Sequence, residues 1–405
     1  MTHSLWSLNA PVKRLSNPIF TWLTSWSLTN LPRLRRSALV IKQSSPPEKV
    51  IAYGIASVFC PPENRNKGYA SHMMRLLHHI LAPAESLPPF PKEWGTPPPS
   101  YPGVGKDARL SMLYSYVGDF YRSCGPSPDT SGWHILGAVG TTWKLKPKDL
   151  IYNDVSDESY YFLSKEQCVN LWESDAAYIT ECMSQLPASP RTRFTCLPNN
   201  GVASYFIHRT LAEAPLHPKH PLEHWGVAVR SEGHEKSPSA YATWTLDMYL
   251  SKPPSILVTR LRASPDSLPT LLKGLFRVAG QIGADSIEVW NLDTNLVNVA
   301  ESMGGHTAAR DDNFPAVVWY GPEKPNEIEW VFNEKYVSFH LGFSEILIHQ
   351  CSLLNQVCMV LSHTRLVIWV VIKYQGFTGT LDQLLLRSRA WLHSAMMFFI
   401  RSRTP

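Results

Sequence analysis

The stretch from Ser57 to Leu77, SVFCPPENRNKGYASHMMRLL, contains residues whose types and spacing could bind a phosphate group. Arg65 and Lys67 bring positive charge, and Gly68 lacks the Cβ that would keep a pyrophosphate away from the backbone. The N–H groups in the first turn of the helix predicted to follow also attract anions. An ordinary strand–turn–helix corner fits the same R-x-x-G-x-A spacing, so the loop alone leaves both interpretations open.

The elements around this loop can be predicted from periodicity. Residues 50–60 are apolar and β-branched, which predicts a buried strand, and residues 70–81 have the apolar spacing of an amphipathic helix. Eight prolines between Pro83 and Pro102 predict a long loop. Residues 108–118 predict a second strand, and the sequence GDFYRSCG predicts a short helix after it.

The second half of the chain predicts another α/β unit. Ser164 and Gln167 fit a capping box at the start of a long helix. Beyond residue 200 the pattern predicts strand, strand, helix, strand, helix and a closing strand, AVVWYG at 316–321. The first of these two helices carries one apolar face, formed by Leu268, Leu271, Leu272, Leu275, Phe276 and Ala279.

Composition limits the possible classes of protein. With 405 residues, 44% of them hydrophobic, the chain can bury a sizeable core and predicts two domains. The seven scattered cysteines include no CxxC pair, which argues against a zinc site or a disulfide framework and favours a reducing compartment. Six basic and two acidic residues follow residue 336, so this segment holds +4 of the net charge of +5. The nearly neutral remainder argues against nucleic-acid binding.

The two ends of the chain differ from its centre. We expect no secretory signal and a cytoplasmic location; a mitochondrial transit sequence is the alternative, because residues 1–47 hold six basic residues and no acid. Residues 337–405 are apolar without a sustained period, and no run is long enough to span a membrane. We expect this tail to be a non-native extension that folding does not require, with a peripheral membrane anchor as the alternative.

The motifs resemble those of a known superfamily. Arg65, Gly68 and Ala70 fill the R/Q-x-x-G-x-G/A pattern of the acetyl-CoA pyrophosphate loop of GNAT N-acetyltransferases, and FYRSCG is similar to their second signature. The segments YGIASVFCPPENRNKGYASHMM, LYSYVGDFY and TCLPNNGVASYFIHR resemble the fungal group typified by lysine 6-N-acetyltransferase. The resemblance covers residues 21–336, roughly three quarters of the chain. It implies a GNAT-type mixed sheet flanked by helices and a second GNAT-like α/β domain on the C-terminal side.

The resemblance also implies roles for particular residues. Tyr121 would protonate the departing CoA thiolate, although it could equally be a packing residue. Ser115, at the end of a strand, could position CoA. The remaining cofactor-binding residues would hold the pantetheine arm or the pyrophosphate, mainly through their backbone, and are Ser57, Val58, Phe59, Arg65, Asn66, Lys67, Gly68, Tyr69, Ala70 and Ser71.

The chain is expected to divide into four segments. We expect an acetyl-CoA-binding GNAT domain at 1–150, a helical connection at 151–200, a degenerate GNAT-like domain at 201–336 and the atypical tail at 337–405. The related proteins have an aspartate where this chain has Tyr116, and they have more residues ahead of the first matching strand. In the superfamily the helices of that preceding segment line the acceptor side of the cleft, so the second departure implies an incomplete acceptor site.

The expected function is therefore transfer of an acetyl group from acetyl-CoA to a small amine, such as the side-chain amine of free lysine. The amine would attack directly, without a covalent enzyme intermediate, and Cys60 would not be a nucleophile because no base is evident beside it. Glu63 is a weak candidate for the general base. The alternatives are a non-catalytic acetyl-CoA-binding relative and an acyltransferase for a secondary-metabolite amine.

No metal is expected. Two groups of histidines are candidate metal ligands, and the first could also supply a base near the amine, but neither has the accompanying groups that a metal site needs. These groups are His72, His78 and His79 on the predicted helix, and His217, His220 and His224 on a proline-broken loop.

Overall fold

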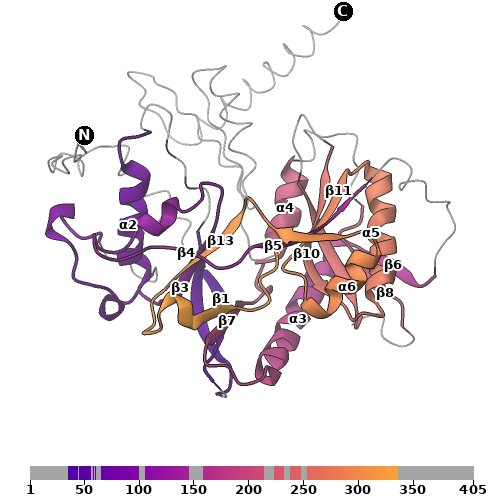
Figure 1. The fold of residues 1–405 in the computed structure, drawn as a ribbon, viewed down its shortest axis with the longest axis horizontal. Coiled ribbons are helices and arrows are strands. Elements are labelled where there is room, and N and C mark those ends of the chain that lie inside the picture. Colours follow the sequence, from indigo (N-terminus) through magenta and orange to yellow (C-terminus); the bar gives the residue numbers. More distant parts are fainter. Residues whose placement is uncertain are drawn as a thin grey trace, which may run out of the picture. The chain divides into compact units, whose positions relative to one another are not determined.

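The computed structural model describes residues 35–43, 45–55, 58, 60, 65–99, 105–145, 158–213, 223–231, 238–247 and 253–335. All of them belong to one compact unit of the chain, Met1–Gly342. Within these ranges the fold is mixed α/β, with two seven-stranded sheets and helices beside them (Figure 1). The predicted fold class is therefore confirmed. No helix of the described ranges is long and apolar enough to cross a membrane.

The first sheet has the strand order β14-β7-β1-β2-β3-β13-β4. The pairs β1–β2 and β3–β13 are antiparallel, whereas β2 and β3 are parallel. A parallel pair needs a crossover connection, and here the connection contains the predicted helix, α2. The bounds are β1 Arg35–Ile41, β2 Glu48–Gly54, β3 Ala108–Ser115, β4 His134–Ile135, β7 Thr192–Cys196, β13 Phe314–Trp319, β14 Ile328–Trp330 and α2 Tyr69–Leu81.

The second sheet has the order β12-β5-β11-β10-β9-β8-β6 and contains one parallel pair, β10–β11. Helix α5 connects these two strands and packs on β6, β8 and β11, while α6 packs on α5 and β12. The strand bounds are β5 Val139–Lys144, β6 Tyr160–Leu163, β8 Gly226–Val229, β9 Tyr241–Asp247, β10 Ser255–Arg262, β11 Ser286–Trp290 and β12 His306–Ala309. The helices are α3 Lys165–Gln185, α4 Ser204–Glu213, α5 Leu268–Ile282 and α6 Thr294–Ser302.

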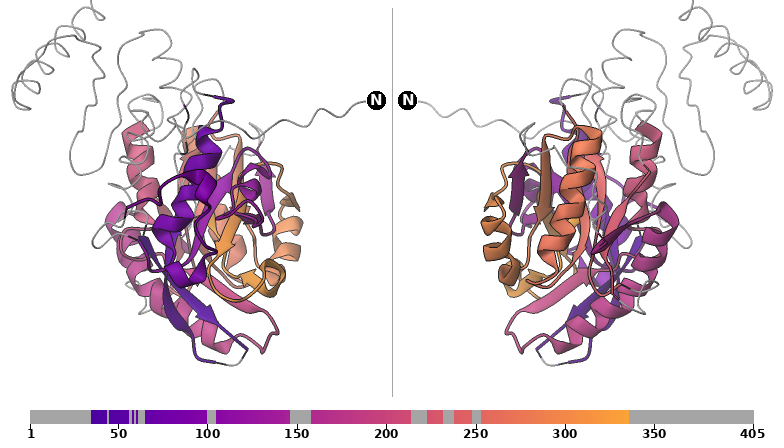
Figure 2. Two further views of the ribbon diagram at one scale, coloured as in Figure 1. Left: turned by 90° about the vertical axis from the view of Figure 1, so that its left-hand side faces the viewer. Right: turned by 90° about the vertical axis from the view of Figure 1, so that its right-hand side faces the viewer.

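The two faces of the first sheet bury different partners. Helix α2 covers one face (Figure 2). There Met74, Leu77 and Ile80 join Tyr53 and Leu113 in one buried cluster. The other face packs against α3, α4 and residues of the second sheet in a separate cluster. Because side chains alternate along a strand, Leu113 and its neighbour Tyr114 lie on opposite faces of β3. The side chain of Tyr114 accordingly packs with Trp290 of the second sheet.

Several predicted elements are confirmed. Helix α2 lies within one residue of its predicted start, and the capping box at Ser164 and Gln167 is formed at the start of α3. The predicted face of α5 is buried except for Phe276, which is half-buried. The proline-rich loop contains two short 3₁₀ turns, η2 Ala84–Ser86 and η3 Lys92–Trp94.

The strand assignments need two corrections. The closing strand of the predicted second unit, β13, lies in the first sheet, where it pairs with β3; β12 takes the corresponding place in the second sheet. The range 151–200, predicted as a helical connection, also contains β6 and β7, which lie in different sheets. Partners in a sheet are chosen by contacts distant in sequence, so local patterns cannot assign them. The division at residues 150, 200 and 336 stays a prediction.

The strand predicted at 50–60 is also shorter than expected. Strand β2 ends at Gly54, and one further backbone bond, from Ile55 N to the Met112 carbonyl oxygen at 2.7 Å, continues its pairing with β3. The strand predicted at 108–118 likewise ends at Ser115. The short predicted helix is the 3₁₀ turn η4, Phe120–Ser123.

Candidate functional site

The candidate site begins where the parallel strands β2 and β3 stop pairing. Their last matched residues are Gly54 and Met112, whereas β3 continues to Ser115 with β13 as its partner on the other side. Beyond Ile55, the described residues that follow β2 form no further ladder with β3. On this side of β3, the ladder formed by the described residues therefore ends at Met112, three residues before the end of the strand.

The loop after β2 leads to a helix start suited to an anion. Gly68 is the N-cap of α2 and has a left-handed backbone, with φ of 77°, which glycine adopts without strain. The cap has no side-chain hydrogen bond, and the first turn contains no acidic residue. The first N–H groups of a helix have no acceptor within the helix, and the dipole adds partial positive charge there. This end of α2 thus has the chemistry of an anion site.

The loop is held in shape by bonds within itself. Arg65 donates from Nε to the carbonyl oxygen of Cys60 at 3.1 Å, which ties its two ends together. Asn66 also has a left-handed backbone, with φ of 58°. Ser71 donates from Oγ to the Gly68 carbonyl oxygen at 3.0 Å, so its hydroxyl closes the first turn of α2.

The predicted cofactor-binding residues are placed as follows. Arg65, Asn66, Lys67 and Gly68 are exposed, and Tyr69, Ala70 and Ser71 are half-buried at the start of α2. Val58 packs against the cluster beneath α2. Ser57 and Phe59 lie outside the described residues, as does Glu63. Their roles stay predictions, but the described members gather at one end of α2 and beside β2.

Tyr121 lies on η4, which contacts α2. Its ring packs edge-on against Phe120 and Trp133, with centroid distances of 5.1 and 6.4 Å. Burial raises the pKa of Tyr121 to about 12. The phenol therefore keeps its proton at every physiological pH.

Ser115 is engaged in a turn. Its hydroxyl donates to the Gly118 carbonyl oxygen at 2.8 Å and accepts from the Val117 N–H at 3.2 Å. These two bonds stabilise the turn that follows β3, and a direct contact between this hydroxyl and CoA would compete with them. Tyr116, the next residue, is 45% exposed.

The histidines of α2 have structural roles. His78 is fully buried, its Nε2 donates to the Cys124 carbonyl oxygen at 2.7 Å, and its Nδ1 accepts from the Tyr320 hydroxyl at 3.0 Å. The Ser111 hydroxyl, itself an acceptor from Trp133 Nε1, lies 3.3 Å from the Tyr320 hydroxyl and continues this network.

Burial lowers the pKa of His78 to about 3, so this histidine is neutral. Burial also lowers the pKa of His79, whose Nε2 donates to the Pro126 carbonyl oxygen at 2.8 Å. Neither imidazole is therefore placed to act as a base on a substrate. No group of three or more possible metal ligands occurs among the described residues. His217 and His220 lie outside them, while His224 stacks on Phe162.

A charged cluster beside the end of β3 could not be found from the sequence. The Trp290 ring has the Arg310 guanidinium 3.7 Å from its centroid and the Lys335 ammonium 4.0 Å from it. Glu288 accepts from Trp290 Nε1 at 2.7 Å, and burial raises the pKa of this carboxyl. Tyr114 packs on the same indole at 5.4 Å. An isolated WNLD or ARDDNF motif in the sequence gives no signal for such an assembly.

Comparisons with known proteins support the resemblance. Residues 144–339 match the family model GNAT_LYC1-like, the LYC1 GNAT-like C-terminal domain. A search of curated proteins finds no match.

Among solved structures, a GCN5-related N-acetyltransferase from Kribbella flavida is 13% identical over 71% of this chain and 57% of its own, with a TM-score of 0.35. Eis1 from Mycobacterium abscessus is 13% identical over 71% of this chain and 60% of its own, with a TM-score of 0.36. A probable N-acyltransferase from Enterococcus faecalis V583 is 9% identical over 70% of this chain and 59% of its own, with a TM-score of 0.34. The chain thus spans less than two thirds of the length of each. Through residues 144–339, the chain resembles the GNAT-superfamily acetyltransferases of the LYC1 group.

Proposed function

We propose that the chain is an acetyl-CoA-dependent N-acetyltransferase that acts on a small amine, such as the side-chain amine of free lysine. The observation that carries this proposal is the junction between β2 and α2. There the described pairing of two parallel strands ends, and a helix capped by a left-handed glycine follows, with no acidic residue in its first turn. Exposed Arg65 and Lys67 add positive charge to the same loop.

In this proposal the chain's own backbone holds the co-substrate. The N–H groups of residues 66–71 bind the pyrophosphate, because they combine donors with the positive end of the α2 dipole. The backbone of Ser57, Val58 and Phe59 binds the pantetheine arm beside the edge of β3 that β2 has left. No metal takes part in the reaction.

The reaction is a direct transfer. The amine nitrogen attacks the thioester carbonyl carbon, the C–N bond forms, the C–S bond breaks, and CoA leaves as a thiolate. The amine must lose a proton before or during attack, since an ordinary lysine side chain with a pKa of about 10.4 is neutral in only about one molecule in 2,500 at pH 7. Removing this proton costs about 4.6 kcal/mol at that pH, which a base or a chain of waters must offset.

Tyr121 is proposed to stabilise the departing thiolate. With its pKa raised to about 12 by burial, the phenol is a weaker acid than a thiol with a pKa of roughly 8.5. Complete transfer of its proton would be uphill by about 5 kcal/mol. We therefore assign Tyr121 the role of hydrogen-bond donor to the sulfur, with water supplying the proton that the thiolate finally takes.

A second candidate is a non-catalytic relative that binds acetyl-CoA. The observation that favours it is the turn after β3, where the Ser115 hydroxyl is engaged in two hydrogen bonds. An acyltransferase for a secondary-metabolite amine would use the same chemistry with another acceptor.

Calorimetry with acetyl-CoA, followed by an assay for thiol release with lysine, separates these functions. Binding and lysine-dependent release support the proposed enzyme. Binding without release from any amine supports the binding protein, and release with other amines alone supports the alternative acceptor. Absence of binding would refute the proposal.

A further inference from the structure

A pocket of about 730 Å³ lies at the carboxyl ends of the parallel strands β10 and β11. Its wall consists of the C-terminal half of α3, the last residues of β10, the loop from β11 into α6, and the segment from β14 to Glu334. Arg191, which follows α3, and residues Leu136 and Gly137 complete it. This pocket is separate from the loop and helix start of the candidate site described above.

The pocket occupies the place in the second sheet that the candidate site occupies in the first. Strands β1 and β2 are antiparallel and β2 and β3 parallel; β9 and β10 are antiparallel and β10 and β11 parallel. A helix connects the parallel strands in each case, α2 in one and α5 in the other. Pairing of β10 with β11 stops at Val258 and Val289, although β10 continues to Arg262. The strands beside the two sites thus have the same order and the same directions.

The start of α5, beside the second sheet, is unsuited to binding a pyrophosphate. Pro269 lies in the first turn of α5 and lacks the N–H that an anion would bind. Asp266 lies just ahead of this turn and would repel a phosphate. A ligand of the pocket must therefore be recognised by side chains rather than by a helix start.

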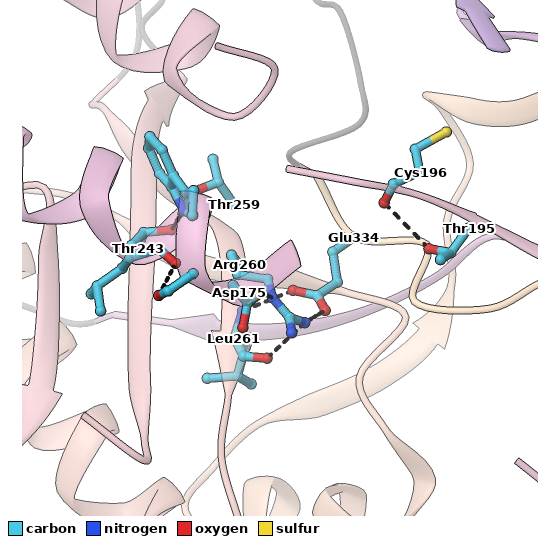
Figure 3. Close-up of polar contacts among 11 residues, drawn as sticks. Asp175, Thr195, Cys196, Thr243, Thr259, Arg260, Leu261 and Glu334 are labelled. Carbon is cyan, nitrogen blue, oxygen red and sulfur yellow. Dashed lines mark hydrogen bonds and ion pairs between the residues drawn. The ribbon is translucent and has the colours of Figure 1, made fainter. Parts of the chain in front are cut away.

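One arginine in the wall is fully engaged. Arg260 is buried and donates from Nε to Asp175 Oδ2 at 2.6 Å, and it also forms an ion pair with Glu334 (Figure 3). Glu334 in turn accepts from the N–H of Leu261 at 2.8 Å. This triad fixes the end of β10 to α3 and to the segment after β14, so the pocket has a rigid base.

Two other arginines in the wall are available. The Arg262 guanidinium lies 3.5 Å from the ring centroid of Tyr178, and stacking of this kind leaves the N–H edges of a guanidinium open. Within the part of the chain that the structure describes, the side chains of Arg262 and Arg191 have no hydrogen-bond acceptor or carboxylate partner. A stacked guanidinium with open N–H edges matches a carboxylate in a bidentate manner.

The same wall also contains acids and apolar groups. Glu329 has no ion pair within the described ranges, and Asp293 accepts one hydrogen bond, from the N–H of Asn295 at the start of α6. These carboxylates can accept from an ammonium group. Leu186 and Leu292 supply apolar surface for an aliphatic chain. Such a wall fits a small zwitterion with an aliphatic side chain.

The pocket also reaches the end of β3. Trp290 and Asn333 belong to its wall. Tyr114, the residue before the last one of β3, packs on Trp290 and donates from its hydroxyl to Asn333 Oδ1 at 2.7 Å. Tyr114 faces the second sheet, whereas α2 covers the opposite face of β3. An acceptor could therefore approach the end of β3 from the face that α2 leaves open.

We propose that this pocket binds the α-carboxylate of an amino-acid acceptor, with Arg262 as the principal donor and Arg191 as the second. The identification of the ligand as the acceptor rests on the proposed function. Arg262 would then determine specificity by favouring amino acids over simple alkyl amines, without contacting the reacting atoms.

The test compares L-lysine with cadaverine, which has the same side-chain amine but no carboxylate. Thiol release from acetyl-CoA is measured for the full chain and for Arg262→Ala. We expect KM for lysine to rise about 10- to 100-fold, since hydrogen bonds between charged groups are lost, while kcat and the KM for cadaverine stay within about two-fold. Arg262→Lys should recover part of the loss.

Arg230→Ala is the matched control, because Arg230 also stacks on a tyrosine, Tyr161, but is not part of the pocket wall. Equal effects of Arg262→Ala on both amines, or no effect on lysine, would overturn the inference. So would a parent protein that uses cadaverine as well as lysine.

Failure of the proposed enzymatic function can be distinguished from failure of the pocket assignment. If no amine releases thiol, calorimetry with lysine alone still decides: binding that is lost in Arg262→Ala and kept in Arg230→Ala supports the pocket, and absence of binding by the parent overturns it.

Discussion

Acidification should destabilise the protein through His78. This side chain is fully buried in α2, where both ring nitrogens have partners and the ring packs on Trp133 with centroids 4.4 Å apart. Burial lowers its pKa from an ordinary value of 6.5 to about 3. A group whose pKa is lowered by folding, and which is neutral above that pKa, binds fewer protons in the folded state than in the unfolded one. Its contribution to stability is therefore present above pH 6.5 and is lost as the pH falls from 6.5 toward 3.

The magnitude follows from these two pKa values. At pH 5.0 an unfolded histidine is protonated about 30 times in 31, whereas the folded one stays almost entirely neutral. Protonation of the unfolded state alone therefore lowers the free energy of unfolding by about 2 kcal/mol between pH 7.5 and pH 5.0. The result hardly depends on the exact folded pKa, since a value of 4 gives the same loss to within about 0.1 kcal/mol.

The assay is urea unfolding followed by circular dichroism at pH 7.5 and pH 5.0. His78→Gln should be less stable than the parent at pH 7.5, by about 1–3 kcal/mol, because the buried network loses a partner. Between pH 7.5 and pH 5.0, the free energy of unfolding should fall by about 2 kcal/mol less in His78→Gln than in the parent. His79, whose pKa is also lowered by burial, contributes equally to both proteins and cancels in the comparison.

His306→Gln, at an exposed position on β12, is the control and should leave the difference between the two pH values close to that of the parent. Equal losses on acidification for the parent and His78→Gln would refute the assignment of His78 as a buried neutral group.

Four further changes test other parts of the structure. Gly68→Glu should abolish acetyl-CoA binding in calorimetry, because it adds negative charge and strain at the N-cap of α2, whereas Gly283→Glu, at another left-handed glycine, should leave binding intact; unchanged binding by Gly68→Glu would exclude this loop as the cofactor site. Tyr121→Phe should lower kcat by about 100-fold at unchanged affinity for acetyl-CoA, and a kcat within two-fold of the parent would leave the tyrosine a packing residue. Cys60→Ala should retain most activity in the thiol-release assay, whereas complete loss with the fold intact would indicate a covalent acyl-enzyme. Arg260→Met should lower the free energy of unfolding by about 3–5 kcal/mol in urea titrations, because it leaves two buried carboxylates without their cation; a loss below about 1 kcal/mol would show that the triad is not a structural clamp.

Local patterns predicted the helices well and the sheets less well. Helix α5 follows from its apolar spacing, and the start of α3 follows from Ser164 and Gln167, because each signal lies within a few residues of the element that it specifies. The pairing of Phe314 with Ser115 joins residues far apart in the chain, and no local pattern contains that information. The sequence AVVWYG predicts a strand correctly but cannot predict which sheet receives it.

The candidate site shows the same division. The loop from Arg65 to Ala70 could be identified because its glycine, its charges and the following helix are contiguous. The role of His78 could not, because its partners come from residues 124 and 320. Likewise the stacking of Arg262 on Tyr178 joins a strand of the second sheet to α3, and sequence spacing gives no sign of it.

The position of β13 has a consequence for how the first site is supported. Residues 1–150 do not contain all the strands of the first sheet, since β13 pairs with β3 from Leu110 to Ser115. Tyr320, which follows β13 directly, binds His78 and thereby connects the C-terminal half of the chain to α2, whose start is proposed to hold the pyrophosphate. The second half of the chain thus contributes twice to the proposed reaction, through the strand and the phenol that hold α2 and β3, and through the pocket beside Tyr114. A second unit whose helix start at α5 is unsuited to a phosphate is therefore compatible with the proposed enzyme, because its proposed task is to support the first site and to bind the acceptor.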